Sequence, residues 1–155
     1  MTPRRAVPHG SDDGQITLLV IAYTLIAFCL VAVVADAAAV HLARTQLLDA
    51  ADAAALDAAD ALGDEAYQAG LGSAAVPLTD AGVRAQATRY LSTYEPPSLL
   101  DRVAVQPGTG TDDGDSATVV LAGRVRLPVA ATVVASWRGG IVITVTSKAR
   151  APLRP

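Results

Sequence analysis

The chain has 155 residues, of which 52% are hydrophobic and 4% aromatic, and it carries a net charge of −3 and one cysteine. This length fits one small domain, and a single cysteine excludes a disulfide framework. The few aromatic residues do not alternate with a concentrated basic stripe, so nucleic-acid binding is not expected.

Residues 16–35, ITLLVIAYTLIAFCLVAVVA, form an uninterrupted apolar run near the N-terminus. About 20 apolar residues suffice for a helix to cross the hydrocarbon core of a bilayer. The run therefore predicts a single transmembrane helix over residues 15–35, with membrane lipid as its partner. The one cysteine, Cys29, lies inside this run.

Basic residues around the run predict its orientation. Arg4 and Arg5 precede it, whereas only Arg44 follows within about 20 residues, so the positive-inside rule places residues 1–14 in the cytoplasm as a leader. The remainder would then be extracytoplasmic. The alternative is a cleavable signal sequence with an A-x-A-like site at residues 35–37, but the apolar run is longer than usual for a signal and the helical pattern crosses that site.

Residues 36–62 predict a helical stalk that continues the membrane helix. The segment is dominated by alanine, the best helix former, and contains no glycine or proline before Gly63. One continuous helix over residues 16–62 would be about 70 Å long, at about 1.5 Å per residue.

The predicted stalk is amphipathic at helical spacing. Its acidic residues Asp49, Asp52, Asp57 and Asp60 cluster on one side and are expected to be a solvated polar face, not a metal site. The opposite side is a helix-packing face, mostly alanine, which lets another helix or a sheet approach closely. We expect the chain's own head and a neighbouring subunit to share it. This face consists of Val40, Leu47, Ala51, Ala54, Ala55, Ala58 and Leu62.

Residues 63–155 predict a small α+β head. After a linker to residue 78, Thr79 and Asp80 form an N-cap signal for a short helix that runs to about residue 94 and stops before Pro96-Pro97. The apolar residues of this helix at helical spacing are Val83, Ala87, Tyr90 and Leu91.

Beyond residue 101 the apolar period becomes two, which is typical of strands. Residues 102–106, 118–127 and 141–150 predict a small antiparallel sheet with one buried face, and residues 128–137 fit either a short helix or a fourth strand. The fold class expected is therefore α+β, in which one N-terminal transmembrane helix continues into a long amphipathic helix, followed by a short helix and the sheet.

Motifs that would support catalysis or cofactor binding are scarce. His9 and His41 are isolated, so the sequence offers no catalytic triad and no zinc site. The glycine-rich residues 108–114 are expected to form a turn, because they miss the dinucleotide-binding spacing and precede a strand. The nearby Asp112, Asp113 and Asp115 could bind calcium weakly, but the closing glutamate of an EF-hand is missing. We expect no enzyme activity, no cofactor and no metal.

Two parts of the N-terminal helix resemble a known family. GQITLL at residues 14–19 enters the apolar run, Asp36 follows it, and AADAAALDAA occupies residues 50–59 of the stalk. This arrangement resembles TadE/TadG-like proteins of Flp (Tad) pilus assembly, in the form common among actinobacteria. The resemblance implies a pseudopilin or minor-pilin-like component of a pilus or related secretion apparatus, whose helix is both membrane anchor and contact for other pilus-assembly subunits.

The same resemblance implies processing at one position. In pilin-like relatives a prepilin peptidase cuts after a glycine just before the apolar helix, and the matching bond here joins Gly14 to Gln15. Many relatives carry glutamate five residues after the cut, where this chain has Leu19. Two versions therefore stay open: a processed subunit, which could enter a surface pilus, and an uncleaved anchored accessory protein that binds a partner through its head.

Overall fold

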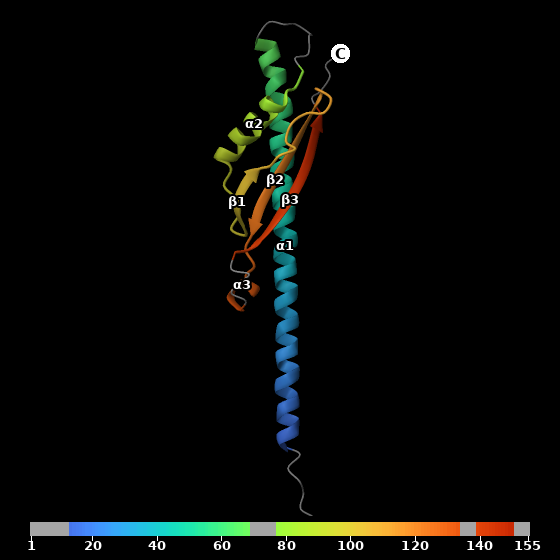
Figure 1. Cartoon of the computed structure of the whole chain (residues 1–155). Coiled ribbons are helices and arrows are strands. Elements are labelled where there is room, and N and C mark those ends of the chain that lie inside the picture. Colours follow the sequence, from blue (N-terminus) through green and yellow to red (C-terminus); the bar gives the residue numbers. More distant parts are fainter. Residues whose placement is uncertain (1–12, 69–76, 134–138, 151–155) are drawn as a thin grey trace, which may run out of the picture.

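The computed structural model describes residues 13–68, 77–133 and 139–150. They form one long helix and an α+β head at its C-terminal end (Figure 1). In chain order the elements are α1 (Asp13–Gln68), α2 (Asp80–Thr93), β1 (Leu100–Val105), β2 (Ser116–Val125), α3 (Ala130–Val133) and β3 (Ile141–Arg150). The predicted α+β class is confirmed, and most of the predicted leader lies outside the described residues.

Helix α1 is continuous over 56 residues, which makes it about 84 Å long. It passes without interruption from the apolar run into the alanine-rich stalk, as predicted. It also continues six residues beyond Leu62, because a glycine such as Gly63 weakens a helix by only about 1 kcal/mol relative to alanine and does not by itself end one.

The sheet has three antiparallel strands in the order β1-β2-β3. Strands β2 and β3 pair along their whole length, from Ser116 opposite Arg150 to Val125 opposite Ile141. Strand β1 starts earlier than predicted, at Leu100, and its register shifts between Asp101 and Ala104, where the intervening Arg102 has φ 54°. Strand β2 also starts earlier than predicted and ends at Val125.

The segment predicted as a short helix or a fourth strand begins as the one-turn helix α3. Its last residues, 134–137, lie outside the described part of the chain. Within the described residues, the sheet therefore has three strands.

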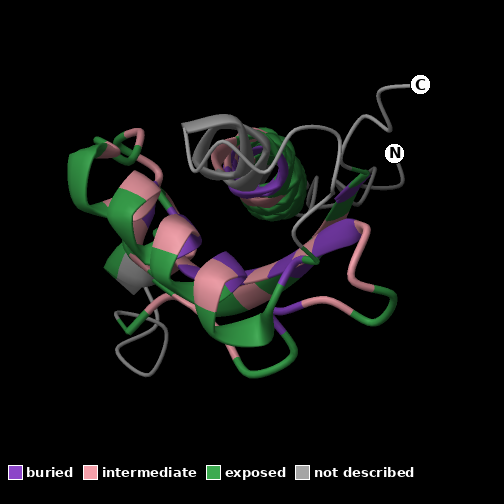
Figure 2. Cartoon of the chain, turned by 90° about the horizontal axis from the view of Figure 1, so that it is seen from above, coloured by how far each residue is buried: buried purple, intermediate pink, exposed green. Residues whose placement is uncertain are grey.

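Helices α1 and α2 pack together and both contact the sheet, and the view from above shows the sheet curving around α1 (Figure 2). The core contribution of α1 is nearly all alanine, and Leu47 is the one large fully buried side chain among the helix residues whose burial is described. The sheet supplies the bulk through Val119, Leu121 and Val125. Strand and helix approach closely at Gly123, where an added Cβ would lie 3.3 Å from Leu47 Cδ1 and 3.2 Å from Leu100 Cδ2.

Helix α2 forms where its capping signal predicts. The Thr79 hydroxyl accepts a hydrogen bond from the Gly82 amide at 3.1 Å, and the helix buries Val83 and Ala87. A hydrogen bond from Gln86 Nε2 to Asp57 Oδ2, 2.8 Å long, ties the helix to α1. The short helix is thereby fixed to the stalk by both apolar packing and a polar link.

We predict that Leu47→Ala destabilises the head by about 2–5 kcal/mol, because it removes the largest side chain that α1 places in the core. The matched control is Leu56→Ala on the same helix, where the side chain is 57% exposed and the change should be within about 0.5 kcal/mol. Denaturant unfolding of the full chain in detergent micelles measures both. Equal effects of the two substitutions would contradict this packing.

Candidate functional site

Residues 16–35 of α1 carry no buried side chain, and we call them the bare segment. Every side chain from residue 15 to residue 31 is exposed, and burial on the helix begins only at Ala39. Most of the exposed residues are large and apolar, for example Ile21 at 61% and Phe28 at 66%. By length and composition, α1 is the one helix among the described residues that could cross a membrane.

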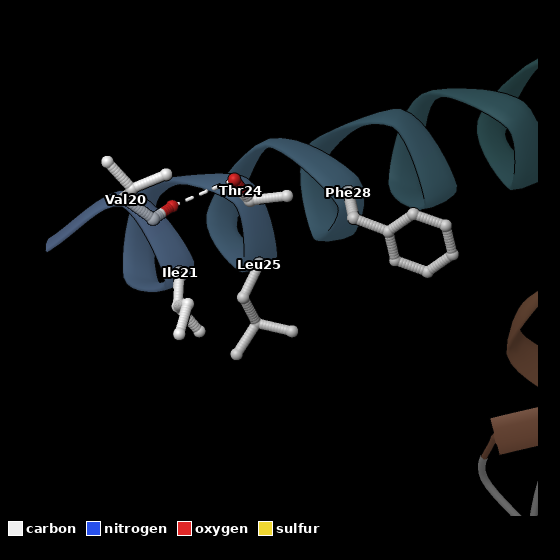
Figure 3. A pocket seen from close by; sticks show the side chains of 5 residues that line it. All are labelled: Val20, Ile21, Thr24, Leu25 and Phe28. Atoms are coloured by element: carbon white, nitrogen blue, oxygen red, sulfur yellow. Dashed lines mark hydrogen bonds between the residues drawn. The ribbon is translucent and has the colours of Figure 1, made fainter. Parts of the chain in front are cut away.

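One polar side chain of this bare segment, Thr24, is satisfied within the helix. The Thr24 hydroxyl donates to the Val20 carbonyl at 2.8 Å (Figure 3), so the threonine needs no partner outside α1. A shallow hollow beside it is lined by Val20, Ile21, Thr24, Leu25 and Phe28, all from the same helix. Because no charged groups converge there, the hollow offers an apolar surface for lipid or another helix and no chemistry.

Asp36 separates the bare part of α1 from the packed part. Its carboxylate accepts hydrogen bonds from the Val129 amide at 2.9 Å and the Ala130 amide at 2.7 Å. These amides lie at the start of α3, where the backbone N–H groups of a helix have no acceptor within the helix itself. A residue at the end of the apolar run therefore holds the start of α3 against α1.

The sequence did not reveal this role of Asp36, since the two partners are more than ninety positions away in the chain. Two weak signals were present. The aspartate directly follows an apolar run, and the short helix begins after Pro128-Val129 without a capping side chain of its own.

The predicted helix-packing face lies in the core of the same chain. Five of its members are fully buried, Val40 is half-buried, and the side chain of Leu62 lies outside the described residues. A neighbouring helix could reach the buried alanines only if the sheet moved away. The five fully buried members are Leu47, Ala51, Ala54, Ala55 and Ala58.

The opposite side of the stalk faces away from the head. Asp49, Asp52 and Asp60 are exposed there, whereas Asp57 is half-buried and accepts the Gln86 hydrogen bond. Three large apolar side chains are also exposed on the packed part of α1: Leu42 at 49%, Leu48 at 38% and Leu56 at 57%. These leucines leave some apolar surface on the stalk available to a partner.

The glycine-rich residues 108–114 form a turn at the end of the head away from the bare helix. Asp113 organises this turn, because its carboxylate accepts hydrogen bonds from the Asp115 and Ser116 amides and from the Ser116 hydroxyl. Among the described residues, no group of three metal-ligating side chains converges. Asp113 also forms an ion pair with Lys148 of β3, with 3.7 Å between Oδ2 and Nζ, so it ties the turn to the sheet.

The same turn is fastened to α2. Asp80 Oδ1 accepts a hydrogen bond from the Thr111 amide at 2.8 Å, and Arg84 Nη2 donates to the Thr109 carbonyl at 3.0 Å. The buried Thr109 hydroxyl in turn bonds the backbone of Val120. These contacts make the turn part of the scaffold.

The remaining predicted residues lie at the other end of the chain. Gly14 is in the first turn of α1 and Gln15 is exposed next to it. Cys29 is a free thiol on the bare segment, and His41 is exposed on the stalk. His9 lies outside the described residues.

We predict that Asp36→Ala increases hydrogen exchange at the amides of Val129 and Ala130, because both lose their acceptor. Loss of such a cap costs about 0.5–2 kcal/mol, which here would favour local separation of α3 from α1. The matched control is Asp52→Ala, an exposed aspartate on the same helix, which should leave these amides unchanged. Unaltered exchange in the Asp36 variant would show that the carboxylate does not hold α3.

A second prediction concerns acid. Hydrogen bonds from the Asp115 amide, the Ser116 hydroxyl and the Ser116 amide lower the pKa of Asp113 to about 2. A lowered pKa in the folded state means that this carboxylate stabilises the turn fully above its unfolded pKa, and that the contribution is lost as pH falls through about 2. The NMR amide signals of residues 115 and 116 should therefore shift with a midpoint near that pH. Asp113→Asn should abolish the transition, and a midpoint near pH 4 in the native chain would contradict the turn geometry.

Comparison with known families finds a match for the N-terminal part of the chain. Residues 14–61 match the family described as "Putative Flp pilus-assembly TadE/G-like", a range that covers the bare segment, Asp36 and most of the packed stalk. No curated protein and no solved structure matches the chain.

Proposed function

We propose that this chain, whose residues 14–61 are a TadE/G-like Flp pilus-assembly segment, is a pseudopilin or minor-pilin-like subunit of an Flp (Tad) pilus or a related secretion apparatus. The observation that carries the proposal is the division of α1 into a bare apolar part and a part packed by the chain's own head. One rigid helix thereby joins a membrane anchor to an α+β head, which is the organisation that a helix-anchored assembly subunit requires.

The proposed topology has residues 1–14 in the cytoplasm and the head outside the membrane. Arg4 and Arg5 before the apolar run support this orientation through the positive-inside rule. The structure also bears on the signal-sequence alternative. Cleavage after residue 37 would remove Asp36 and with it the acceptor for the start of α3, so an intact helix suits the observed head better.

Contacts between subunits would use surface that the head leaves free. The fully buried alanine face is already occupied by the sheet. Two surfaces remain on α1: the bare residues 16–35, and the exposed leucines Leu42, Leu48 and Leu56 on the packed stalk. We therefore assign assembly contacts mainly to the bare residues, where packing between helices replaces packing against lipid.

The second candidate is an uncleaved anchored protein that binds a partner through its head. Leu19 in place of the glutamate of many relatives favours it, and so does the start of α1 at Asp13, since the bond after Gly14 then lies inside a helix. In this version the bare segment anchors the chain permanently, and the proposed prepilin peptidase is not a partner.

Processing separates the two candidates. With an active prepilin peptidase, the processed version predicts loss of residues 1–14 and a new N-terminus at Gln15. Gly14→Val should block the cut, because a branched side chain then stands at the position where the proposed site has none. Mass spectrometry of the intact protein measures both results.

The matched control is Gly10→Val, which changes another leader glycine and should leave cleavage unchanged. A chain that keeps its leader beside a peptidase that cuts the major pilin would support the anchored version. Surface pili should also disappear when the gene is deleted and return with the native chain. Normal piliation in the deletion strain would contradict both candidates.

A further inference from the structure

The end of the head nearest the bare helix carries exposed apolar side chains. Ile141 and Val142, the first residues of β3, are 44% and 61% exposed. Figure 1 shows this strand end directly above α3, and α3 beside α1 near the point where the helix leaves the head. The apolar surface of the head therefore adjoins the apolar surface of the helix.

The Asp36 contact sets the level of this end relative to the apolar run. A helix needs about 20 residues to cross the hydrocarbon core, and residues 16–35 provide that number with none to spare. The edge of the hydrocarbon would thus fall at Asp36, whose carboxylate holds the Val129 and Ala130 amides. The headgroup layer extends roughly 5–7 Å further on each side.

Basic residues lie on the other two strands and just after β2, at the same end of the sheet as the exposed apolar pair. Arg124 lies directly opposite Val142 in the sheet, and Arg102 is exposed on the irregular part of β1. Arg126 is also exposed and forms an ion pair with Asp101, with 3.5 Å between Nη2 and Oδ2. Apolar side chains beside arginines suit the lipid interface, where anionic headgroups attract basic residues.

We propose that this end of the head, formed by α3 and the start of β3, rests in the phospholipid headgroup layer of the membrane that holds α1. The inference rests on the membrane span in the proposed function. It adds a second point of membrane contact, which restricts the tilt of α1 and its head relative to the membrane. In this arrangement Ile141 and Val142 contact lipid, and Arg102 and Arg124 lie at the level of the phosphates.

Two contacts of described residues, at Gly140 and at the start of α3, hold this position. Gly140 has φ 72°, and a side chain there would strike the Val125 carbonyl, so only glycine lets the chain enter β3 this close to β2. The start of β3 is thus fixed to β2 on one side, while Asp36 fixes the start of α3 to α1 on the other.

The test uses the full chain with Cys29→Ser and a single new cysteine at Val142→Cys, labelled with an environment-sensitive fluorophore. The protein is reconstituted in vesicles of phosphatidylcholine and phosphatidylglycerol, some carrying a quencher at the headgroup. The matched control is Thr146→Cys, an exposed position on the same face of β3 four residues further from the membrane. We expect a blue-shifted and quenched emission at position 142 and neither effect at position 146.

Equal behaviour of the two labels in chains that float with the vesicles would overturn the headgroup contact and leave the membrane span intact. Failure to float would overturn the span, and the headgroup contact with it. A blue shift that appears only as the protein-to-lipid ratio rises would assign this surface to a second copy of the chain and also overturn the proposal. Protease resistance of the head in both labelled variants confirms that each has folded.

Discussion

One continuous helix has to suit two different surroundings, and the rest of the structure depends on how its residues divide between them. The bare part of α1 carries bulky leucine, isoleucine, valine and phenylalanine, which present apolar area outward in every direction. The packed part carries alanine on its core side, which lets the sheet come close. Bulk in that core comes from the strands, and the glycine at position 123 leaves room for Leu47 where strand and helix approach closely.

This division makes the stalk and head a single folded unit. Val119, Leu121 and Val125 of β2 are buried against a core to which α1 contributes a whole row of alanines. Without the helix that face of the sheet would be open to water, and α2 alone is too short to cover it. The sequence boundary after residue 62 is therefore a change of composition, while the packing unit includes the stalk from about Ala39 onward.

Local patterns predicted the elements well because the deciding forces are local. Alanine content and helical spacing predicted the long helix and its core-facing side, Thr79 predicted the start of α2, and alternation predicted three strands. The sequence did not predict the register shift beside Arg102 or the early starts of β1 and β2. Those features depend on how neighbouring strands pair, which no short window of sequence contains.

The candidate site was harder to predict for the same reason. The bare segment follows from composition alone, and the family resemblance at residues 14–61 follows from a short pattern. The Asp36 contact and the exposed end of β3 depend instead on which remote segment folds back onto the helix. The turn around Asp113 could be predicted in part. Its glycines predict a turn, but they do not predict the hydrogen bonds that organise it and fasten it to α2.

The packing also constrains how such a subunit could enter a filament. Because the head occupies the alanine face, subunits that leave the membrane would have to bury the bare residues 16–35 against one another. Lipid tails are as apolar as those side chains, so exchanging lipid for protein gains little from hydrophobicity and depends on shape complementarity between helices. The head stays fixed to α1 at Asp36, directly beyond that bare segment. Helices would therefore pack at the centre of the proposed assembly, with the heads arranged around them at the level where each apolar run ends.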